Sequence, residues 1–197
     1  RAVDEICKSL ASIAPAVDFI RVGSELSCDE AYRGHLIENE LSSCNRRSEV
    51  YERIRNCRII VGTVAAISGK FRLKHFDVAI IDEATQILEP QLLGILCARG
   101  EDEKDAIDKF VLIGDHKQLP AVVQQNAEQA AIYDESLLSI GLSNLKDSLF
   151  ERLYRNCTAA CSSSAIHRSY DMLCRQGRMH PEVALFANRA FYGGRLI

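Results

Sequence analysis

Two apolar runs, each followed at once by polar residues, constrain the fold of this chain more than any other feature. Residues 78–81 lead into Asp82-Glu83, and residues 110–113 lead into the sequence Gly-Asp-His-Lys-Gln-Leu-Pro. Apolar runs without alternation are typical of parallel strands that are covered by helices on both faces of the sheet. In open parallel sheets, working residues collect beyond the carboxyl ends of the strands. Two polar strand ends in this order favour a protein that hydrolyses nucleoside triphosphates.

Strand and helix patterns alternate along the rest of the chain. Apolar spacings of three and four residues predict helices, and short continuous apolar runs predict strands. Helices are expected over residues 1–14, 65–67, 90–97, 145–154 and 181–191, strands over 18–22, 58–64, 76–81 and 110–113, and polar surface helices within 25–56. This alternation predicts an α/β domain with a parallel sheet flanked by helices.

The net charge of the chain gives no support for nucleic-acid binding. Lys plus Arg total 24 and Asp plus Glu total 27, which gives a net charge of −3. Charge alone therefore gives no reason to expect nucleic-acid binding. Any such contact must come from a local patch, and the arginines between residues 46 and 58 are the candidates. The alternative for these arginines is a solvated helical face.

The composition favours an intracellular protein. No run approaches the ~18 apolar residues of a membrane span, and the first residues lack the pattern of a secretory signal. Eight cysteines are scattered along the chain. Cys157 and Cys161 are four apart, which is not the C-x2-C spacing of zinc ribbons. We expect reduced cysteines with a structural role.

The paired carboxylates after the first apolar run can support phosphoryl chemistry. An Asp that closes an apolar strand, such as Asp82, can hold Mg²⁺ that bridges phosphate oxygens. The adjacent Glu83 can polarise an attacking water. The alternative for this pair is a solvated strand end or a helix N-cap.

Three other polar residues can join this chemistry. The amide of Gln118 can contact a γ-phosphate or the attacking water, and Arg178 can neutralise charge that develops on the transferred phosphoryl group. Thr63 also falls at a strand end. The alternatives are an ordinary turn for residues 115–120 and a surface capping role for Arg178 and His180 at the helix that Pro181 opens.

Together these segments resemble the superfamily one helicases, specifically the branch of the nonsense-mediated-decay RNA helicase and senataxin-like proteins. Asp-Glu-Ala-Thr-Gln within residues 76–86 looks like motif II, and the glycine-led sequence within 110–123 looks like motif III. Residues 175–192, with Gln-Gly-Arg-Met-His-Pro and Phe-Tyr-Gly-Gly, are similar to the start of the second motor domain. Residues 58–68 are similar to a nucleic-acid-contacting motif built around Gly-Thr, and residues 2–4 are similar to the tail of motif Ia.

This resemblance implies a domain organisation, cofactors and a partner. It implies a RecA-like parallel sheet of the P-loop NTPase type over residues 1–165, with 25–56 as a helical insertion. Residues 166–197 would be the first elements of a second RecA-like domain. ATP and Mg²⁺ would be the cofactors, and single-stranded RNA or DNA would be the partner.

The resemblance also implies roles for individual residues. Asp82 would bind Mg²⁺, Glu83 would be the general base, and Gln118 would sense the γ-phosphate. Arg178 would be an arginine finger, and Thr63 would contact the nucleic-acid backbone. The remaining nucleotide contacts would come from Gln86, Gly114, Asp115 and Gln176.

The chain departs from the family pattern in two places. It contains no phosphate-binding loop of the form G-x-x-x-x-G-K-[ST], whose place in the family lies upstream of motif Ia and so before Arg1. The residue before the finger arginine is usually a tyrosine that stacks on adenine, and here it is Gly177. We therefore expect the 197 residues to be a fragment of a motor, inactive when isolated.

Two other functions stay open from the sequence. A helicase-like module could scaffold a partner without hydrolysing ATP, and the residues before Arg1 would discriminate between module and motor. A metal-dependent nuclease would use Asp77, Asp82, Glu83 and Asp115. It is the weaker alternative, because neighbouring carboxylates on a strand point apart, whereas two-metal sites bridge ions ~4 Å apart.

Overall fold

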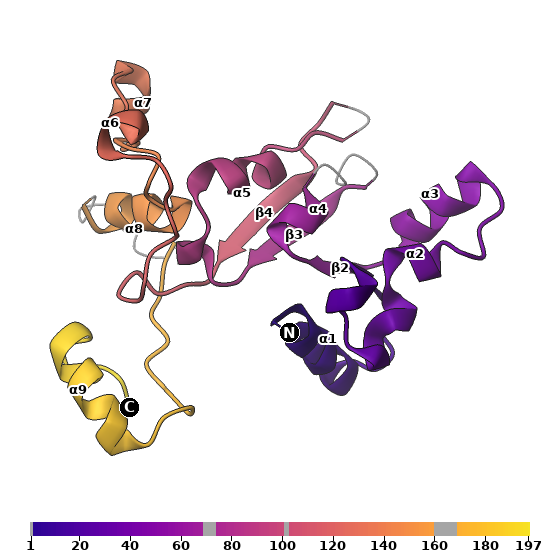
Figure 1. The fold of residues 1–197 in the computed structure, drawn as a ribbon, viewed down its shortest axis with the longest axis horizontal. Helices are drawn as coiled ribbons and strands as arrows, with labels where there is room; N and C mark the ends of the chain where they lie inside the picture. Colours follow the sequence, from indigo (N-terminus) through magenta and orange to yellow (C-terminus); the bar gives the residue numbers. More distant parts are fainter. Residues whose placement is uncertain (1, 69–73, 101–102, 160–168) are drawn as a thin grey trace. The chain divides into compact units, whose positions relative to one another are not determined.

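The computed structural model describes residues 2–68, 74–100, 103–159 and 169–197, and it shows helices flanking two pairs of strands (Figure 1). The chain divides into two compact units, and each is described by itself. The first unit comprises Arg1–Ile81 and Glu89–Val111, and the second comprises Asp82–Leu88 and Leu112–Ile197.

The strands lie almost entirely in the first unit, and helices dominate the second; η marks a 3₁₀ helix. In chain order the elements of the first unit are α1 (Ala2–Ile13), β1 (Phe19–Val22), η1 (Glu25–Ser27), η2 (Glu30–His35), α2 (Ile37–Glu40), α3 (Arg47–Asn56), β2 (Ile59–Gly62), α4 (Val64–Ile67), β3 (Phe76–Ile81), α5 (Glu89–Leu96) and β4 (Ile107–Leu112). The elements of the second unit are η4 (Ala84–Gln86), α6 (Ala127–Ala130), α7 (Glu135–Ser139), α8 (Leu149–Ala159) and α9 (Pro181–Phe191).

The first strand pair, β1 and β2, is the core of the first unit. The strands are parallel, in a register that runs from Phe19 opposite Ile59 to Val22 opposite Gly62. All four residues of β1 are buried. Phe19 packs with Cys7 of α1 on one face, and Ile20 packs in a separate cluster on the other. Burial on both faces explains why this strand carries no polar alternation.

Gly62 lets the end of β2 approach its neighbours closely. A Cβ at this position would lie 2.8 Å from the carbonyl oxygen of Val22 and 2.9 Å from Cγ1 of Ile67. The strand then stops, because the side chain of Thr63 accepts a hydrogen bond from the N–H of Ala66 at 3.2 Å and caps α4. The strand expected over residues 58–64 is therefore shorter than predicted.

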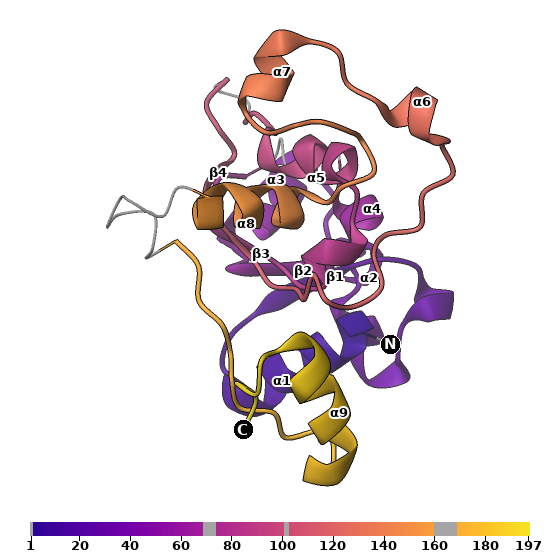
Figure 2. The same cartoon turned by 90° about the vertical axis from the view of Figure 1, so that its left-hand side faces the viewer.

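The second strand pair, β3 and β4, is also parallel. The N–H of Phe76 donates to the carbonyl of Ala106 at 2.8 Å, and beyond the strands the N–H of Ala84 donates to Ile113 at 2.8 Å. Both partners advance along the chain in the same direction, as parallel pairing requires. Helix α5 lies beside this pair in both views (Figure 1 and Figure 2). The predicted α/β class with parallel strands flanked by helices is confirmed, and the described strands form two separate pairs.

Two elements begin three or more residues away from their predicted starts. Strand β4 begins at Ile107, three residues before the predicted start, and ends at Leu112. The helix predicted over residues 145–154 begins at Leu149 and continues to Ala159. The side chain of Asn144 accepts hydrogen bonds from the N–H groups of Lys146 and Asp147, which holds these residues in a turn before the helix.

Among the described helices, none has the length and the apolar character needed to cross a membrane. The described cysteines are free thiols, and Cys7, Cys28 and Cys57 are buried. Burial raises the pKa of all three thiols, so they pack as small apolar residues. The expectation for Cys161 falls outside the described residues.

Candidate active site

The end of β3 presents two exposed carboxylates. Ile81 closes the strand in a buried position, and Asp82 and Glu83 follow it on the surface. One carboxylate oxygen of Asp82 accepts a hydrogen bond from the N–H of Glu83 at 3.0 Å. Glu83 itself has φ 52° and ψ 37°, the left-handed region. That conformation costs a non-glycine residue roughly 1–2 kcal/mol, and such strain is concentrated at functional sites.

The loops after β3 and β4 are joined directly. The bond from Ala84 to Ile113 connects them through the backbone. A Cβ on Gly114 would lie 3.0 Å from Cγ2 and 3.1 Å from the backbone nitrogen of Thr85, so glycine allows the two loops to touch. Thr85 is buried, and its hydroxyl has no partner among the described residues. The two polar strand ends therefore lie next to each other in the second unit.

Asp115 organises the second loop. Its Oδ1 accepts a hydrogen bond from the backbone N–H of Lys117, and its Oδ2 accepts one from Nε2 of Gln118, both at 3.0 Å. The same Oδ2 accepts a third bond, from the hydroxyl of Tyr192, at 2.5 Å. The sequence alternative of an ordinary turn is correct for the backbone, because the N–H of Gln118 donates to the Asp115 carbonyl. In addition, the side chains of Gln118 and Tyr192 form hydrogen bonds to the Asp115 carboxylate in that turn.

The ionisation of this network follows from its hydrogen bonds. Burial alone would raise the pKa of Asp115, but the bonds from Tyr192, Lys117 and Gln118 outweigh it and hold that pKa below its usual value. The bond to Asp115 raises the pKa of Tyr192 to about 12. Both shifts favour one state, in which Asp115 is an anion and Tyr192 is a neutral donor.

Aromatic contacts fix the same loop against α8. The ring of His116 lies 4.4 Å from the ring of Tyr154, which in turn stacks at 6.4 Å on Phe150. The second of these contacts lies along α8, and the first joins that helix to the loop after β4. The loop is thus held on one side by α8 and on the other by the residue that follows α9.

Arg178 is presented on an exposed turn. The side chain of Gln176 closes this turn, donating to the carbonyl of Met179 and accepting from its N–H, both at 3.0 Å. The alternative of a capping role is correct for His180, whose Nδ1 accepts from the N–H of Glu182 at the start of α9. Within the described residues, no recorded contact joins Arg178 to Asp82 or Glu83.

Thr63 and Gln86, which the sequence predicts to contact nucleic acid and nucleotide, lie at short helices. Thr63 is exposed at the N-terminus of α4, in the first unit, and its oxygen is used in capping. Its hydroxyl proton stays available to a phosphate oxygen. Gln86 is exposed at the end of η4, and its backbone N–H donates to the carbonyl of Glu83 at 2.9 Å.

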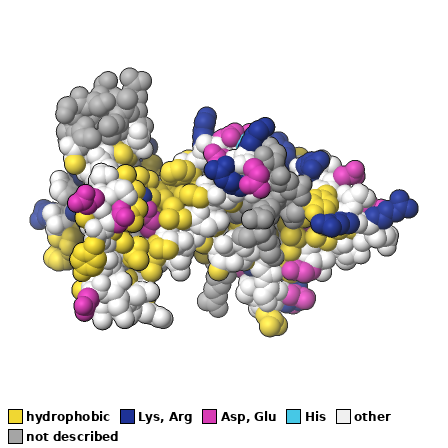
Figure 3. Space-filling model, turned by 90° about the horizontal axis from the view of Figure 1, so that it is seen from above, with side chains coloured by type: hydrophobic (Ala, Val, Ile, Leu, Met, Phe, Trp, Pro, Cys, Tyr) yellow, Lys and Arg dark blue, Asp and Glu magenta, His cyan; other side chains and the backbone are white. Residues whose placement is uncertain are grey.

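The basic segment around α3 separates into bound and exposed arginines. Arg53 is held by two carboxylates, with Nη1 2.7 Å from Asp18 and Nη2 2.7 Å from Glu40, so it serves the structure. Arg55 and Arg58 are exposed. Lys and Arg side chains project from the face of the molecule that Figure 3 shows. The exposed members keep the predicted alternative of a phosphate-contacting patch open.

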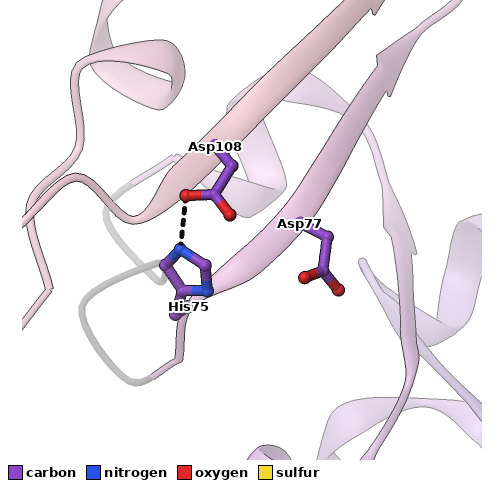
Figure 4. Close-up of side chains that lie close together, drawn as sticks. All are labelled: His75, Asp77 and Asp108. Atoms are coloured by element: carbon purple, nitrogen blue, oxygen red, sulfur yellow. Dashed lines mark hydrogen bonds and ion pairs between the residues drawn. The ribbon is translucent and has the colours of Figure 1, made fainter.

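A cluster that the sequence did not reveal lies where β3 and β4 begin. His75, Asp77 and Asp108 have ligand atoms that all lie within 4.8 Å of one another, and Nε2 of His75 is 2.9 Å from Asp108 (Figure 4). All three are exposed. Asp77 is near the first residue of β3, roughly 13 Å along the strand from Ile81 at ~3.3 Å per residue. That separation argues against one nuclease site containing both Asp77 and Asp82.

The strand-end residues fit Mg²⁺. Asp82 uses one oxygen for the bond to Glu83 and remains exposed, so its carboxylate can offer an oxygen to a hard cation. When bound, Mg²⁺ supplies charge neutralisation to phosphate oxygens. Glu83 accepts no capping bond and is also exposed, which suits a base that must reach a water.

Comparison with known proteins shows which families and relatives this chain is similar to. Residues 35–126 match the family described as AAA domain. The chain is 30% identical over 199 residues to the DNA replication ATP-dependent helicase/nuclease DNA2 of Gallus gallus, covering 99% of this chain and 17% of that protein. It is 31% identical over 151 residues to the 3'-5' exoribonuclease HELZ2 of Mus musculus (76% of this chain, 4% of that protein). It is 36% identical over 141 residues to the probable helicase MAGATAMA 3 of Arabidopsis thaliana (70% and 14%).

The fold is an α/β domain with parallel strands flanked by helices, and it is consistent with the P-loop NTPase class that the matched AAA domain indicates. Within that class, the comparisons support the superfamily one helicases as the family of this chain, without distinguishing a branch. The chain spans less than a fifth of the length of these relatives.

Proposed function

We propose that this chain is part of an ATP-dependent helicase or translocase that couples ATP hydrolysis to movement on single-stranded RNA or DNA. One observation carries the proposal: the bond from Ala84 to Ile113 joins two strand ends that supply Asp82, Glu83 and the Asp115–Gln118 pair. Carboxylates and an amide at adjacent ends of parallel strands suit the binding of Mg²⁺, water and a terminal phosphate.

Each of these residues would have a different role in the transfer of the phosphoryl group. Asp82 would hold Mg²⁺, and Glu83 would accept the proton of the attacking water. The free N–H of the Gln118 amide would donate to the γ-phosphate. Arg178 would meet the charge that develops on the transferred group, which requires the exposed turn that carries it to reach the strand ends.

Further contacts would come from residues around these. Gln86, Gly114, Asp115 and Gln176 would line the nucleotide, and Thr63 would contact the nucleic-acid backbone. Because backbone contacts carry no base information, they suit both RNA and DNA. The motif sequences support the branch of the nonsense-mediated-decay RNA helicase and senataxin-like proteins.

A second candidate function is a scaffold that keeps the fold without hydrolysis, and the residues before Arg1 would discriminate between scaffold and motor. The left-handed backbone of Glu83 does not decide between scaffold and motor, because Glu103, which has no assigned role, also has a positive φ of 60°. The presence of Asp82, Glu83, Gln118 and Arg178 together supports the motor. A G-x-x-x-x-G-K-[ST] sequence ~20–40 residues before Arg1 would support the motor, and a natural start at Arg1 would support the scaffold.

The deciding experiment is a Glu83→Gln substitution in a protein that carries this chain together with its upstream residues. We expect ATP hydrolysis stimulated by single-stranded nucleic acid, and a loss of about 100-fold or more in kcat on removal of the base. Nucleotide binding should persist, because the amide has the same shape. Glu128→Gln, at an exposed position on α6, is the matched control. Unchanged hydrolysis in Glu83→Gln would show that the proposed base is wrong.

A further inference from the structure

The hydroxyl of Tyr192 reaches the candidate active site from a residue 77 positions away in the sequence. Tyr192 directly follows α9, and its N–H donates to the carbonyl of Asn188 at 3.1 Å. The Asn188 side chain holds the turn beyond it, donating to the carbonyl of Leu196 at 2.7 Å and accepting from its N–H at 3.0 Å. The position of Tyr192 is therefore fixed by hydrogen bonds from the preceding helix and in the turn that follows it.

At the other end of this contact, one oxygen serves two donors. Oδ2 of Asp115 accepts from the Tyr192 hydroxyl and from Nε2 of Gln118. A short bond from a hydroxyl to a carboxylate is charge-assisted and is about twice as strong as a neutral one. Tyr192 thus fixes the direction in which the Asp115 carboxylate faces, and that direction sets the place of Gln118.

The Gln118 amide has two N–H groups, and Asp115 occupies one of them. With one N–H anchored, the other has a defined direction in which to meet a phosphate oxygen. Positioning of this kind affects the rate of a reaction more than the affinity for substrate, because it acts on geometry in the transition state.

We propose that Tyr192 is a positioning residue for this site: it holds Asp115, and through Asp115 it holds Gln118. The segment after α9 thereby controls the γ-phosphate sensor. This inference rests on the proposed function, since it assigns Gln118 a phosphate to sense. The hydrogen bond itself can be tested without any nucleotide, so the two parts can fail separately.

The first test measures the ionisation of Tyr192 in this chain by NMR of ¹³Cζ-labelled tyrosine. At pH 11 a tyrosine with the ordinary pKa of about 10 is roughly nine-tenths ionised, whereas one with a pKa near 12 is about one-tenth ionised. We expect one resonance to stay neutral at pH 11, to vanish in Tyr192→Phe and to shift to the ionised position in Asp115→Asn. Tyr133→Phe, at an exposed site, is the control and should leave that resonance in place. Circular dichroism at pH 11 checks that the chain is folded. A Tyr192 resonance that ionises like free tyrosine in folded protein would overturn the proposal.

The second test uses the ATP-hydrolysing protein that carries this chain. Tyr192→Phe should lower kcat about tenfold with KM within twofold, and Asp115→Asn should lower kcat to a similar extent. The double variant should lose no more than either single one, because both act through Gln118. A neutral Tyr192 at pH 11 with unchanged kcat in Tyr192→Phe would overturn the positioning role and leave the proposed function standing. An absence of hydrolysis in the unaltered protein would overturn both.

Discussion

Asp115 is the acceptor at the centre of the hydrogen-bond network in the loop after β4. Three hydrogen bonds converge on its carboxylate, from a backbone N–H, an amide and a phenol. Each donor favours the charged form of Asp115, so the folded protein binds the proton more weakly than the unfolded chain does. The stability of the folded state must therefore depend on pH through this residue.

We expect the contribution of Asp115 to be complete above its unfolded pKa, for which the ordinary value is 3.8. It should be lost as the pH falls below that value, through the lowered pKa of the folded state. Asp115→Asn should thus cost about 1 kcal/mol at pH 6, after allowance for solvent screening, and less at pH 3. Urea unfolding of both proteins at the two pH values measures this. An equal difference at pH 6 and pH 3 would contradict the assignment.

Single residues of the site differ in how far the sequence reveals them. Asp82, Glu83 and Gln118 follow apolar runs, and that local pattern is enough to place them at strand ends. Tyr192 could not be found in this way, because 77 residues separate it from Asp115 and no periodicity spans that interval. The roles of all these residues remain predictions, since geometry shows where groups lie and not what they do.

At the scale of elements, the pairing of β1 with β2 depends on Gly62. A methyl group there would meet the backbone carbonyl of Val22 at 2.8 Å, and a backbone atom cannot rotate away. The two strands would have to separate, and the packing of α4 against them would change with them.

Gly62→Ala should therefore destabilise the first unit by about 1–3 kcal/mol, the usual range for overpacking. The matched control is Gly34→Ala, because a Cβ at Gly34 has nothing within 4 Å. Urea unfolding followed by circular dichroism compares the two variants. Equal midpoints for both variants would show that the strand contact tolerates a side chain.

The sequence predicted the kinds of elements better than their ends. The segment over residues 76–81 became β3 with the predicted bounds, because a continuous apolar run from Val78 to Ile81 marks its end. Strand β4 begins at Ile107, and the polar residues Asp108 and Lys109 that follow interrupt the apolar pattern at the start of the strand. The start of α8 depends on the turn that Asn144 forms with its own backbone, and hydrophobic spacing does not register such a turn.

At the scale of the whole molecule, the strand ends carry the polar side chains to which the proposed function assigns hydrolysis. The 197 residues lack the glycine-rich loop whose backbone N–H groups hold the phosphates in this class of protein. The residues that the resemblance implies for catalysis are all present. The proposed function therefore requires phosphate-binding groups from outside these 197 residues. The chain spans 17% of its DNA2 relative.

We predict that the isolated chain hydrolyses no ATP above background, with or without single-stranded nucleic acid. Phosphate release measured with Mg²⁺ and saturating ATP tests this, and Glu83→Gln shows the background of the preparation. Hydrolysis that depends on Mg²⁺ and disappears in Glu83→Gln would mean that the chain binds phosphates by other groups.

The left-handed backbone of Glu83 has a practical consequence for the choice of a variant that lacks the proposed base. The habitual choice, glutamine, removes the carboxylate and retains the unfavourable conformation. Asparagine adopts the left-handed region more readily than longer side chains do. Glu83→Asn should therefore remove the base and also raise the urea midpoint. A substitution that raises stability while it removes the proposed base would identify Glu83 as a position where activity is gained at the expense of stability.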